Sequence, residues 1–391
     1  MADSTRIERL DELTAHDLRA GGSLKWTRFD GDTIGAFVAE MDFGIAAPIR
    51  AALHAAVEAG SFGYLPPRIA ANLAEACARW QERRYGWQVA PDAIHPVSDV
   101  LTGFELVLRH FSRPDSPVIL PTPAYMPFLT LPPLHGRQVL EVPMAREGDR
   151  YVLDLDEVAK AFEAGGHLLV LCNPGNPTGR VLHTDELAAV TEVVDRYGGR
   201  VFADEVHAPL TYPGHQHVPY ASTSPTAAAH TLTAGSASKA WDLPGLRCAQ
   251  MIVGPADEPV WQRVGTLASS LPSTLGAVAS TAAYRSGEPW LADILRYLAR
   301  NRAHLGELLA RHLPQVGYHP PEGTYLAWLD CRALDLPAPA EFFQDSAGVV
   351  LVEGAECGEV GRGFVRLNFA TPLPIVDRMV TRMAHALGRS G

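Results

Sequence analysis

The chain has 391 residues, 47% of them hydrophobic, and is long enough to bury two unequal domains. Its 33 basic and 44 acidic residues give a net charge of -11, which argues against a nucleic-acid groove or an anionic membrane surface as its main partner. The five cysteines are odd in number, scattered and never spaced as C-x-x-C, which favours neither a disulfide framework nor a zinc site.

The opening stretch, MADSTRIERLDELTAHDLRAGG, is polar and charged and lacks the apolar core of a signal peptide. No later segment approaches the run of about 18 apolar residues that would span a membrane. With the scattered cysteines, these features predict a cytoplasmic protein that has no membrane partner.

The middle of the chain alternates short apolar runs with longer amphipathic segments. The runs resemble buried strands ending in Pro, Gly, Asn or Asp, and they are SPVIL, HLLVLCNPGNPTG, GGRVFADEV, HTLTAG and RCAQMIVG. TDELAAVTEVVDRYG between two of them predicts a helix with Thr184 as its N-cap. This alternation predicts an α/β domain built on a mostly parallel sheet flanked by helices.

From about Pro289 the pattern changes to one long helix, WLADILRYLARNRAHLGELLARHL. Three strand patterns follow, TYLAWLD, GVVLVEG and GFVRLNFA, and then a final helix near Pro374 to Leu387. We therefore expect a large domain over residues 46–285. Residues 286–391 would form a smaller α+β domain together with residues 1–45, which would act as an N-terminal arm.

Polar groups follow several of the predicted strands, where ligands of open α/β sheets bind. CNPGNPTG repeats an Asn before Pro, which directs amide side chains out of the loop, although a plain turn would also explain its Pro and Gly. Asp204 and Glu205 end another run and could hold a ligand cation or a metal, or cap the next segment. Only His207 is near enough to help bind a metal, so a metal site is the weaker interpretation.

The stretch TAGSASKAWDLPGLRCAQ contains Lys239, one of only three lysines in the chain. An amine can lose its proton and attack a carbonyl, which a guanidinium cannot do. Ser236, Ser238 and Arg247 nearby are good phosphate ligands. A phosphate cradle, a carbonyl-reactive amine and a carboxylate that can hold a cation together indicate pyridoxal phosphate.

The motifs NPGNPTG, ADEVH, SASKAWDLPGLR and FVRLNFA, in this order, resemble those of the fold-type I pyridoxal-phosphate superfamily, class I/II aminotransferase branch. FVAEMDFG and FGYLPPR resemble the MalY/PatB-like cystathionine β-lyase branch within it. Members of that branch usually differ from this chain at Phe37, Glu40, Glu353 and Cys357, near the expected substrate pocket. The resemblance covers about residues 30–390 and implies the aspartate-aminotransferase-like fold of PLP-dependent transferases.

The resemblance also implies catalytic roles for particular residues. Lys239 would form the internal aldimine with the cofactor and then remove the substrate α-proton. Asp204 would pair with the pyridine nitrogen, Asn176 would bind the phenolic oxygen, and Tyr125 would stack on the ring. Arg366, in an otherwise apolar strand, would bind the α-carboxylate with help from Asn176, unless it lies on an exposed face.

The implied phosphate site combines side chains with backbone amides at a helix start. Its residues are Ser236, Ser238, Arg247, Asp99 and Val100. Tyr64 would reach the phosphate and the substrate from the other subunit, so a homodimer with shared sites is implied. His207 could contact the cofactor or be a buried structural histidine.

The expected activity is a carbon–sulfur β-lyase acting on L-cystathionine or another S-substituted L-cysteine, with thiol, pyruvate and ammonia as products. An aminotransferase is the alternative, as is a natural-product enzyme that oxidatively deaminates an S-cysteine conjugate. The first chemical step is common to these reactions, so the motifs do not choose between them. A ligand-sensing or protein-interaction module that retained the fold is the alternative from another class.

Overall fold

The computed structural model describes residues 9–388, and within them the larger sheet has the strand order β2-β10-β9-β8-β7-β3-β4. The strands are β2 (Ile94–Val97), β3 (Val118–Thr122), β4 (Val139–Pro143), β7 (Leu168–Cys172), β8 (Arg200–Asp204), β9 (Thr231–Gly235) and β10 (Ala249–Val253). Only β10 among them runs antiparallel to its neighbours, so the prediction of a mostly parallel sheet is confirmed.

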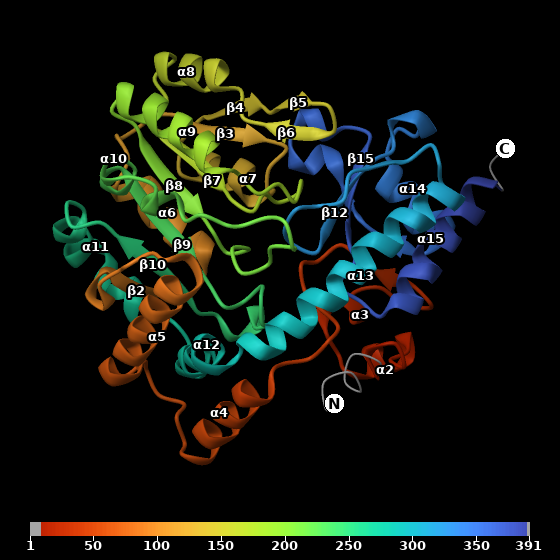
Figure 1. The fold of residues 1–391 in the computed structure, drawn as a ribbon, viewed down its shortest axis with the longest axis horizontal. Helices are drawn as coiled ribbons and strands as arrows, with labels where there is room; N and C mark the ends of the chain where they lie inside the picture. The colour runs from red at the N-terminus through yellow and green to blue at the C-terminus, as the bar shows by residue number, and fades with distance from the viewer. Residues whose placement is uncertain (1–8, 389–391) are drawn as a thin grey trace.

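Helices cover both faces of this sheet, as Figure 1 shows. The strands alternate their side chains between two hydrophobic cores, so that Phe202 faces one core while Val201 and Ala203 face the other. The core that contains Phe202 lies against α6 (Val100–His110), α7 (Pro127–Leu134) and α11 (Glu258–Ser270). The opposite core lies against α8 (Leu155–Glu163), α9 (Thr184–Arg196) and α10 (Pro225–Ala229).

The predicted N-cap of α9 is wrong by one residue, because His183 rather than Thr184 occupies that position. His183 has extended backbone geometry, and its N–H donates to the Glu186 carboxylate at 2.7 Å. This bond caps the first turn of α9, so the helix has its N-cap at His183, one residue before Thr184.

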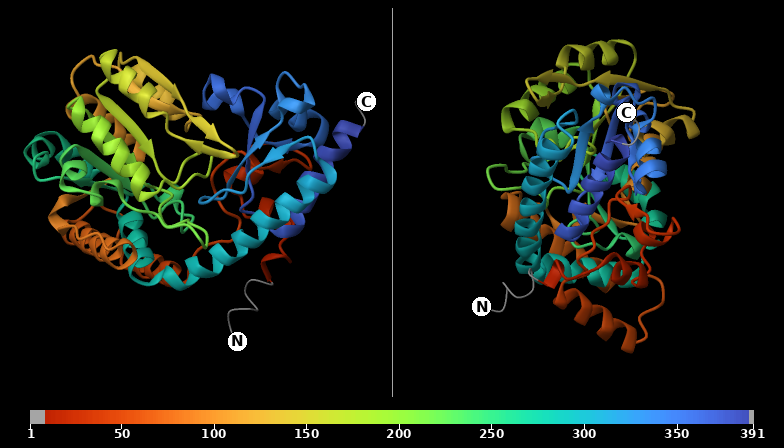
Figure 2. Two further views of the ribbon diagram at one scale, coloured as in Figure 1. Left: turned by 45° about the horizontal axis from the view of Figure 1, so that its top comes forward. Right: turned by 90° about the vertical axis from the view of Figure 1, so that its right-hand side faces the viewer.

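A second, antiparallel sheet has the order β11-β12-β15-β14. Its strands are β11 (Gly317–Tyr318), β12 (Leu326–Asp330), β14 (Val352–Glu353) and β15 (Phe364–Asn368). The long helix α13 (Glu288–His312) runs from the region of the larger sheet to this second sheet (Figure 2, left). Beside the second sheet lie α14 (Pro339–Ala347) and α15 (Leu373–Gly388).

The N-terminal part of the described chain contributes β1 (Ile34–Gly35), which pairs in parallel with β13 (Val349–Val350) in a separate two-stranded sheet. It also contains α2 (Ala15–Ala20) and α3 (Leu24–Thr27), and α4 (Ala47–Glu58) follows it. This pairing supports the predicted arm, although residues 1–8 of that arm lie outside the described residues. The domain boundaries themselves stay a prediction.

The remaining elements are α5 (Pro67–Tyr85), α12 (Thr274–Ser286) and the hairpin of β5 (Ala145–Glu147) and β6 (Arg150–Val152). All five cysteines are free thiols. Across residues 9–388, every helix is too short or too polar to cross a membrane.

Candidate active site

A cavity of about 590 Å³ lies between the carboxyl ends of β8 and β9, the start of α6, and the second sheet with the N-terminal arm. This volume is in the range of pockets that hold a small organic ligand. Its lining includes ten of the residues predicted for the site, namely Asp99, Val100, Tyr125, Asn176, Asp204, His207, Ser236, Ser238, Lys239 and Arg247. Arg366 lines it from the second sheet, so residues from most of the chain meet here.

Lys239 lies in the loop that follows β9, and its side chain points into the cavity rather than to the surface. Its Nζ donates to the backbone carbonyl of Ala39 at 3.1 Å. Burial lowers the pKa of the Lys239 amine, and the nearby Glu40 carboxylate opposes that shift. A half-buried lysine with a lowered pKa has the properties required of a nucleophilic amine.

Asp204 is the last residue of β8 and is only 3% exposed. One carboxylate oxygen accepts from the backbone N–H of Val206 at 3.2 Å, and the other accepts from the thiol of Cys172 at 3.6 Å. Burial raises the pKa of Asp204 to about 6. Among the residues that the structure describes, no basic side chain forms an ion pair with this carboxylate, so it can accept a cationic partner from a ligand.

Arg366 is the middle residue of β15, and the alternative that it lies on an exposed face is wrong, because it is 3% exposed. Its Nη1 donates to Oδ1 of Asn176 at 3.0 Å, and its Nη2 donates to the carbonyl of Phe37 at 2.7 Å. Its Nε is buried and has no hydrogen-bond partner. The guanidinium therefore retains an unused donor, as expected of a group that binds a carboxylate.

The opposite end of the cavity meets the amino terminus of α6. Asp99 is the N-cap of this helix, and its side chain accepts from the Thr102 N–H at 2.8 Å. The second Asp99 oxygen binds Arg247 Nη1 at 2.7 Å. Ser236 is buried, and its hydroxyl donates to the Cys248 carbonyl and accepts from the Ser238 N–H. Helix amides, hydroxyls and a guanidinium thus gather where the sequence predicts a phosphate.

His207 and Tyr125 lie on the cavity wall between these two ends. Burial lowers the pKa of His207 to about 3, so its ring is neutral at physiological pH. Its Nδ1 is buried without a hydrogen-bond partner, and its ring contacts Tyr325 edge to face. Burial raises the pKa of Tyr125, so the phenol stays protonated. Glu205 has a structural role instead, because it accepts from the Tyr220 N–H at 2.8 Å.

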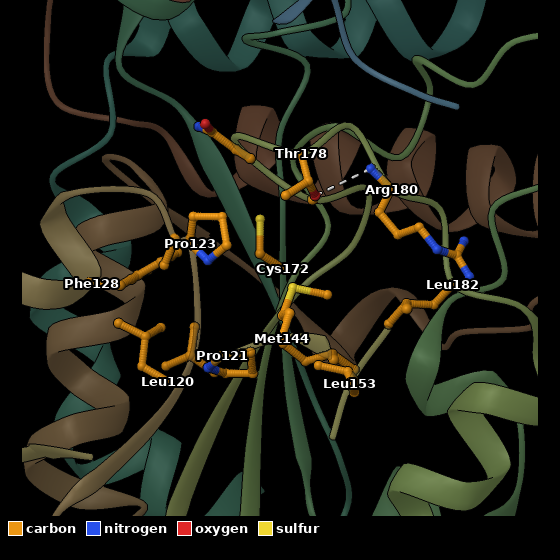
Figure 3. A pocket seen from close by; sticks show the side chains of 15 residues that line it. Leu120, Pro121, Pro123, Phe128, Met144, Leu153, Cys172, Thr178, Arg180 and Leu182 are labelled. Atoms are coloured by element: carbon orange, nitrogen blue, oxygen red, sulfur yellow. Dashed lines mark hydrogen bonds between the residues drawn. The ribbon is translucent and has the colours of Figure 1, made fainter. Parts of the chain in front are cut away.

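A separate cavity of about 40 Å³ lies behind the Asn-Pro loop and also reaches Asn176. Figure 3 shows Leu120, Pro121 and Pro123 on one side of it and Arg180 and Leu182 on the other, with Cys172 between them. It is too small and too apolar for a phosphorylated cofactor. Burial raises the pKa of the Cys172 thiol well above its usual value, so it remains a donor to Asp204.

Residues 37–42 of the arm, which we call the arm segment, form part of the site through their backbone. The Asn368 side-chain amide donates to the carbonyls of Val38 and Glu40, at 2.7 and 2.6 Å. The Tyr325 hydroxyl donates to the Ala39 carbonyl at 3.0 Å, beside the bond from Lys239. Sequence reasoning missed these supports. The Arg-Leu-Asn order of β15, which places two polar side chains on one strand face, is the signal that could have indicated Asn368.

The four departures from the resembled branch do not all face the cavity. Phe37 lines it, whereas Glu40, Glu353 and Cys357 are not part of its lining. The Glu353 carboxylate accepts from the Ala340 N–H at the start of α14, and Cys357 is fully buried in a small apolar core. Phe37 is therefore the departure that lines the cavity, whereas Glu40 and Cys357 lie close enough to Lys239 and Arg366, respectively, to oppose the lowering of the pKa of those groups by burial.

Tyr64 does not line the cavity of its own chain. Its side chain is 94% exposed and borders a surface hollow of about 430 Å³ together with Phe62 and Leu271. In this structure Tyr64 therefore does not contact the cavity that contains Lys239.

The residues around the cavity fit pyridoxal phosphate. The buried Asp204 carboxylate would hold the protonated ring nitrogen, and the unpartnered Nδ1 of His207 lies on the same wall. Lys239 would bind the aldehyde, and the start of α6 with Ser236, Ser238 and Arg247 would hold the phosphate.

Comparisons with known proteins agree with this interpretation. The profile of the family described as aminotransferase class I and II matches residues 39–383. The chain is 36% identical to a cystathionine β-lyase of Corynebacterium glutamicum, over 97% of this chain and 100% of that protein. Among solved structures, it is similar to cystalysin from Treponema denticola, which contains pyridoxal 5'-phosphate, with a TM-score of 0.90, 26% identity and coverage of 97% and 98% of the two chains.

A pyridoxal-phosphate-bound C-S lyase from Staphylococcus hominis is similarly close, with a TM-score of 0.88, 27% identity and coverage of 97% and 98%. The matched profile covers most of the chain, and relatives named cystathionine β-lyase match it along nearly their full length. The chain therefore belongs to the class I and II aminotransferase family of fold-type I pyridoxal-phosphate enzymes, in the branch that contains the cystathionine β-lyases.

Proposed function

We propose that this protein is a carbon–sulfur β-lyase that cleaves L-cystathionine or another S-substituted L-cysteine. One observation carries the proposal. Lys239, Asp204 and Arg366 converge on a single cavity, in a chain whose relatives over its full length are named cystathionine β-lyases. The overall reaction consumes water and releases a thiol, pyruvate and ammonia.

When bound, pyridoxal phosphate supplies an electron-withdrawing ring that accepts the electron pair left on the substrate α-carbon. The buried Asp204 carboxylate would hold a proton on the ring nitrogen of the bound cofactor, and a protonated ring would withdraw electrons more strongly than an uncharged one. Arg366 holds the α-carboxylate and so fixes which bond of the α-carbon faces the lysine. Burial lowers the pKa of the Lys239 amine, which favours its unprotonated form, and this amine takes the α-proton. The thiolate then leaves from the β-carbon.

The experiment supplies L-cystathionine to the purified holoenzyme and measures pyruvate, ammonia and free thiol together. Equal amounts of the three products support the lyase. Production of a keto acid only when a second keto acid is added would indicate an aminotransferase instead. Loss of ammonia with the carbon–sulfur bond intact and oxygen consumed would indicate oxidative deamination. Cofactor binding without turnover of any amino acid would support a sensing or interaction module.

We further propose that the enzyme is a homodimer in which Tyr64 completes the site of the partner subunit. Tyr64, Phe62 and Leu271 are 94%, 67% and 59% exposed and border the same surface hollow, which a second copy would cover. Light scattering should give twice the chain mass, and Leu271→Asp should shift the enzyme toward a monomer with weaker cofactor binding. A monomeric wild type would refute this part. The cytoplasmic location stays a prediction.

A further inference from the structure

We propose that Arg28 determines substrate specificity by binding a carboxylate at the far end of the substrate's S-substituent. The inference rests on the proposed lyase function and narrows its substrates to S-substituted L-cysteines whose substituent ends in a carboxylate. No catalytic role is assigned to Arg28, because it lies on the arm and away from the loop of Lys239.

Arg28 follows α3 directly and lines the same cavity as Lys239 and Arg366. The side chains that the arm and the second sheet contribute to this part of the cavity are mostly apolar, and they are Leu24, Phe29, Phe37, Val350, Leu351 and Val352. Such a wall accommodates the methylene groups of a thioether. Arg28 supplies a positive charge within this apolar surface.

Two aromatic rings hold the guanidinium in place. Its central carbon lies 5.9 Å from the centroid of Phe29 and 5.8 Å from that of Phe37. The two rings contact each other edge to face, with centroids 5.5 Å apart. Contacts between a guanidinium and ring faces orient the group without neutralising its charge.

Arg28 also differs from the other cations of the cavity in its partners. Lys239 donates to the Ala39 carbonyl, Arg247 is paired with Asp99, and Arg366 binds Asn176 and Phe37. Within residues 9–388, the exposed Arg28 side chain contacts the two rings and has no carboxylate within ion-pair distance, while its backbone N–H donates to the Leu24 carbonyl at 3.2 Å. Glu356 lines the cavity as well, but it does not approach the guanidinium closely enough to pair with it.

Phe37 lies between Arg28 and Arg366, the arginine that would bind the substrate α-carboxylate. Its carbonyl accepts from Arg366 at 2.7 Å, and its ring lies beside Arg28. One residue thus separates two guanidinium groups that face the same cavity. A ligand with a carboxylate at each end suits two such cations, because each guanidinium can form a forked pair with one carboxylate. L-Cystathionine has such a second carboxylate, whereas a simple S-alkyl cysteine does not.

The test compares two substrates that differ only in charge, S-(2-carboxyethyl)-L-cysteine and its amide S-(2-carbamoylethyl)-L-cysteine. Pyruvate release by the holoenzyme gives kcat/KM for each. The wild type should prefer the acid, and Arg28→Gln should lower the acid-to-amide ratio by about tenfold, as expected for a partly exposed charged hydrogen bond. Arg28→Lys keeps the charge and should retain most of the preference.

Arg263→Gln is the matched control, because it removes the same charge from an exposed position on α11 outside the cavity. It should leave the ratio unchanged, and the amide should be cleaved equally well by all variants, which shows that they are folded. An unchanged ratio in Arg28→Gln, or an equal fall in Arg263→Gln, overturns the inference and leaves the lyase proposal standing. Failure of the wild type to release pyruvate from either substrate overturns both.

Discussion

Replacing Asp204 with asparagine should raise the free energy of unfolding of the cofactor-free protein. The same substitution should reduce the stabilisation that the protein gains when it binds the cofactor. The carboxylate lies at the end of β8, is 3% exposed and has no basic partner among the described residues. Burial raises its pKa from 3.8 to about 6, so the folded protein resists its ionisation. The Asp204 charge that would bind the cofactor therefore lowers the free energy of unfolding of the cofactor-free protein.

The sign and size of the effect follow from the two pKa values. Below pH 3.8 the carboxyl is protonated in both the folded and the unfolded state, and its charge costs nothing. The cost grows as the pH rises and is complete above about pH 6. A gap of about two pKa units corresponds to about 3 kcal/mol at pH 8 and to about half of that at pH 5. In Asp204→Asn, the side-chain oxygen can still accept from the Val206 N–H. The variant should therefore be more stable than the cofactor-free wild type by most of this free energy.

The assay is urea unfolding of cofactor-free wild type and Asp204→Asn at pH 8 and pH 5. The variant should be more stable at both pH values, with the larger margin at pH 8. Added pyridoxal phosphate should stabilise the wild type more than the variant, because it supplies the cation that the carboxylate lacks. A margin that does not change with pH, or a variant less stable than wild type at pH 8, would refute the assigned cost of burial.

Three further outcomes are expected. Lys239→Ala should lose pyruvate release by about a thousandfold or more, and borohydride should no longer attach the cofactor to the protein; retention of either would reject the assigned amine. Arg366→Lys should raise KM for every S-substituted cysteine by about tenfold, because an ammonium cannot form the forked pair, and an unchanged KM would contradict it. Arg180 binds Glu322 at 2.7 Å in a buried pair that joins the Asn-Pro loop to the chain before β12. Arg180→Ala should therefore lower the free energy of unfolding by about 3 kcal/mol, and Glu322→Gln in the same chain should recover part of it.

The strands of the larger sheet were predictable because their signal is local. An apolar run that ends at a polar residue predicts each strand. The run before Asn173 is β7, which ends at Cys172, and the run that ends at Asp204 is β8. The same local signal indicated α13 and β15. Most of the predicted site residues gather around one cavity because they end a strand, follow one or begin a helix, whereas Arg366 lies in the middle of β15 and Tyr64 lies outside the cavity. Their individual roles stay predictions.

Features that depend on distant segments could not be predicted in this way. The run GVVLVEG reads as one strand, but it divides into β13, which pairs with the arm, and β14, which pairs with β15. The bond from Arg366 to Asn176 joins residues 190 positions apart. Arg28 stands in a polar stretch with no periodicity, and only the fold shows that it faces the same cavity as Lys239.

The arm segment connects the arginine expected to bind the α-carboxylate with the lysine. The carbonyl of Phe37 accepts from Arg366, and the carbonyl of Ala39, two residues later, accepts from Lys239. The same three residues of backbone therefore help to set the positions of both side chains, and a substitution that displaces this short stretch should disturb both groups together.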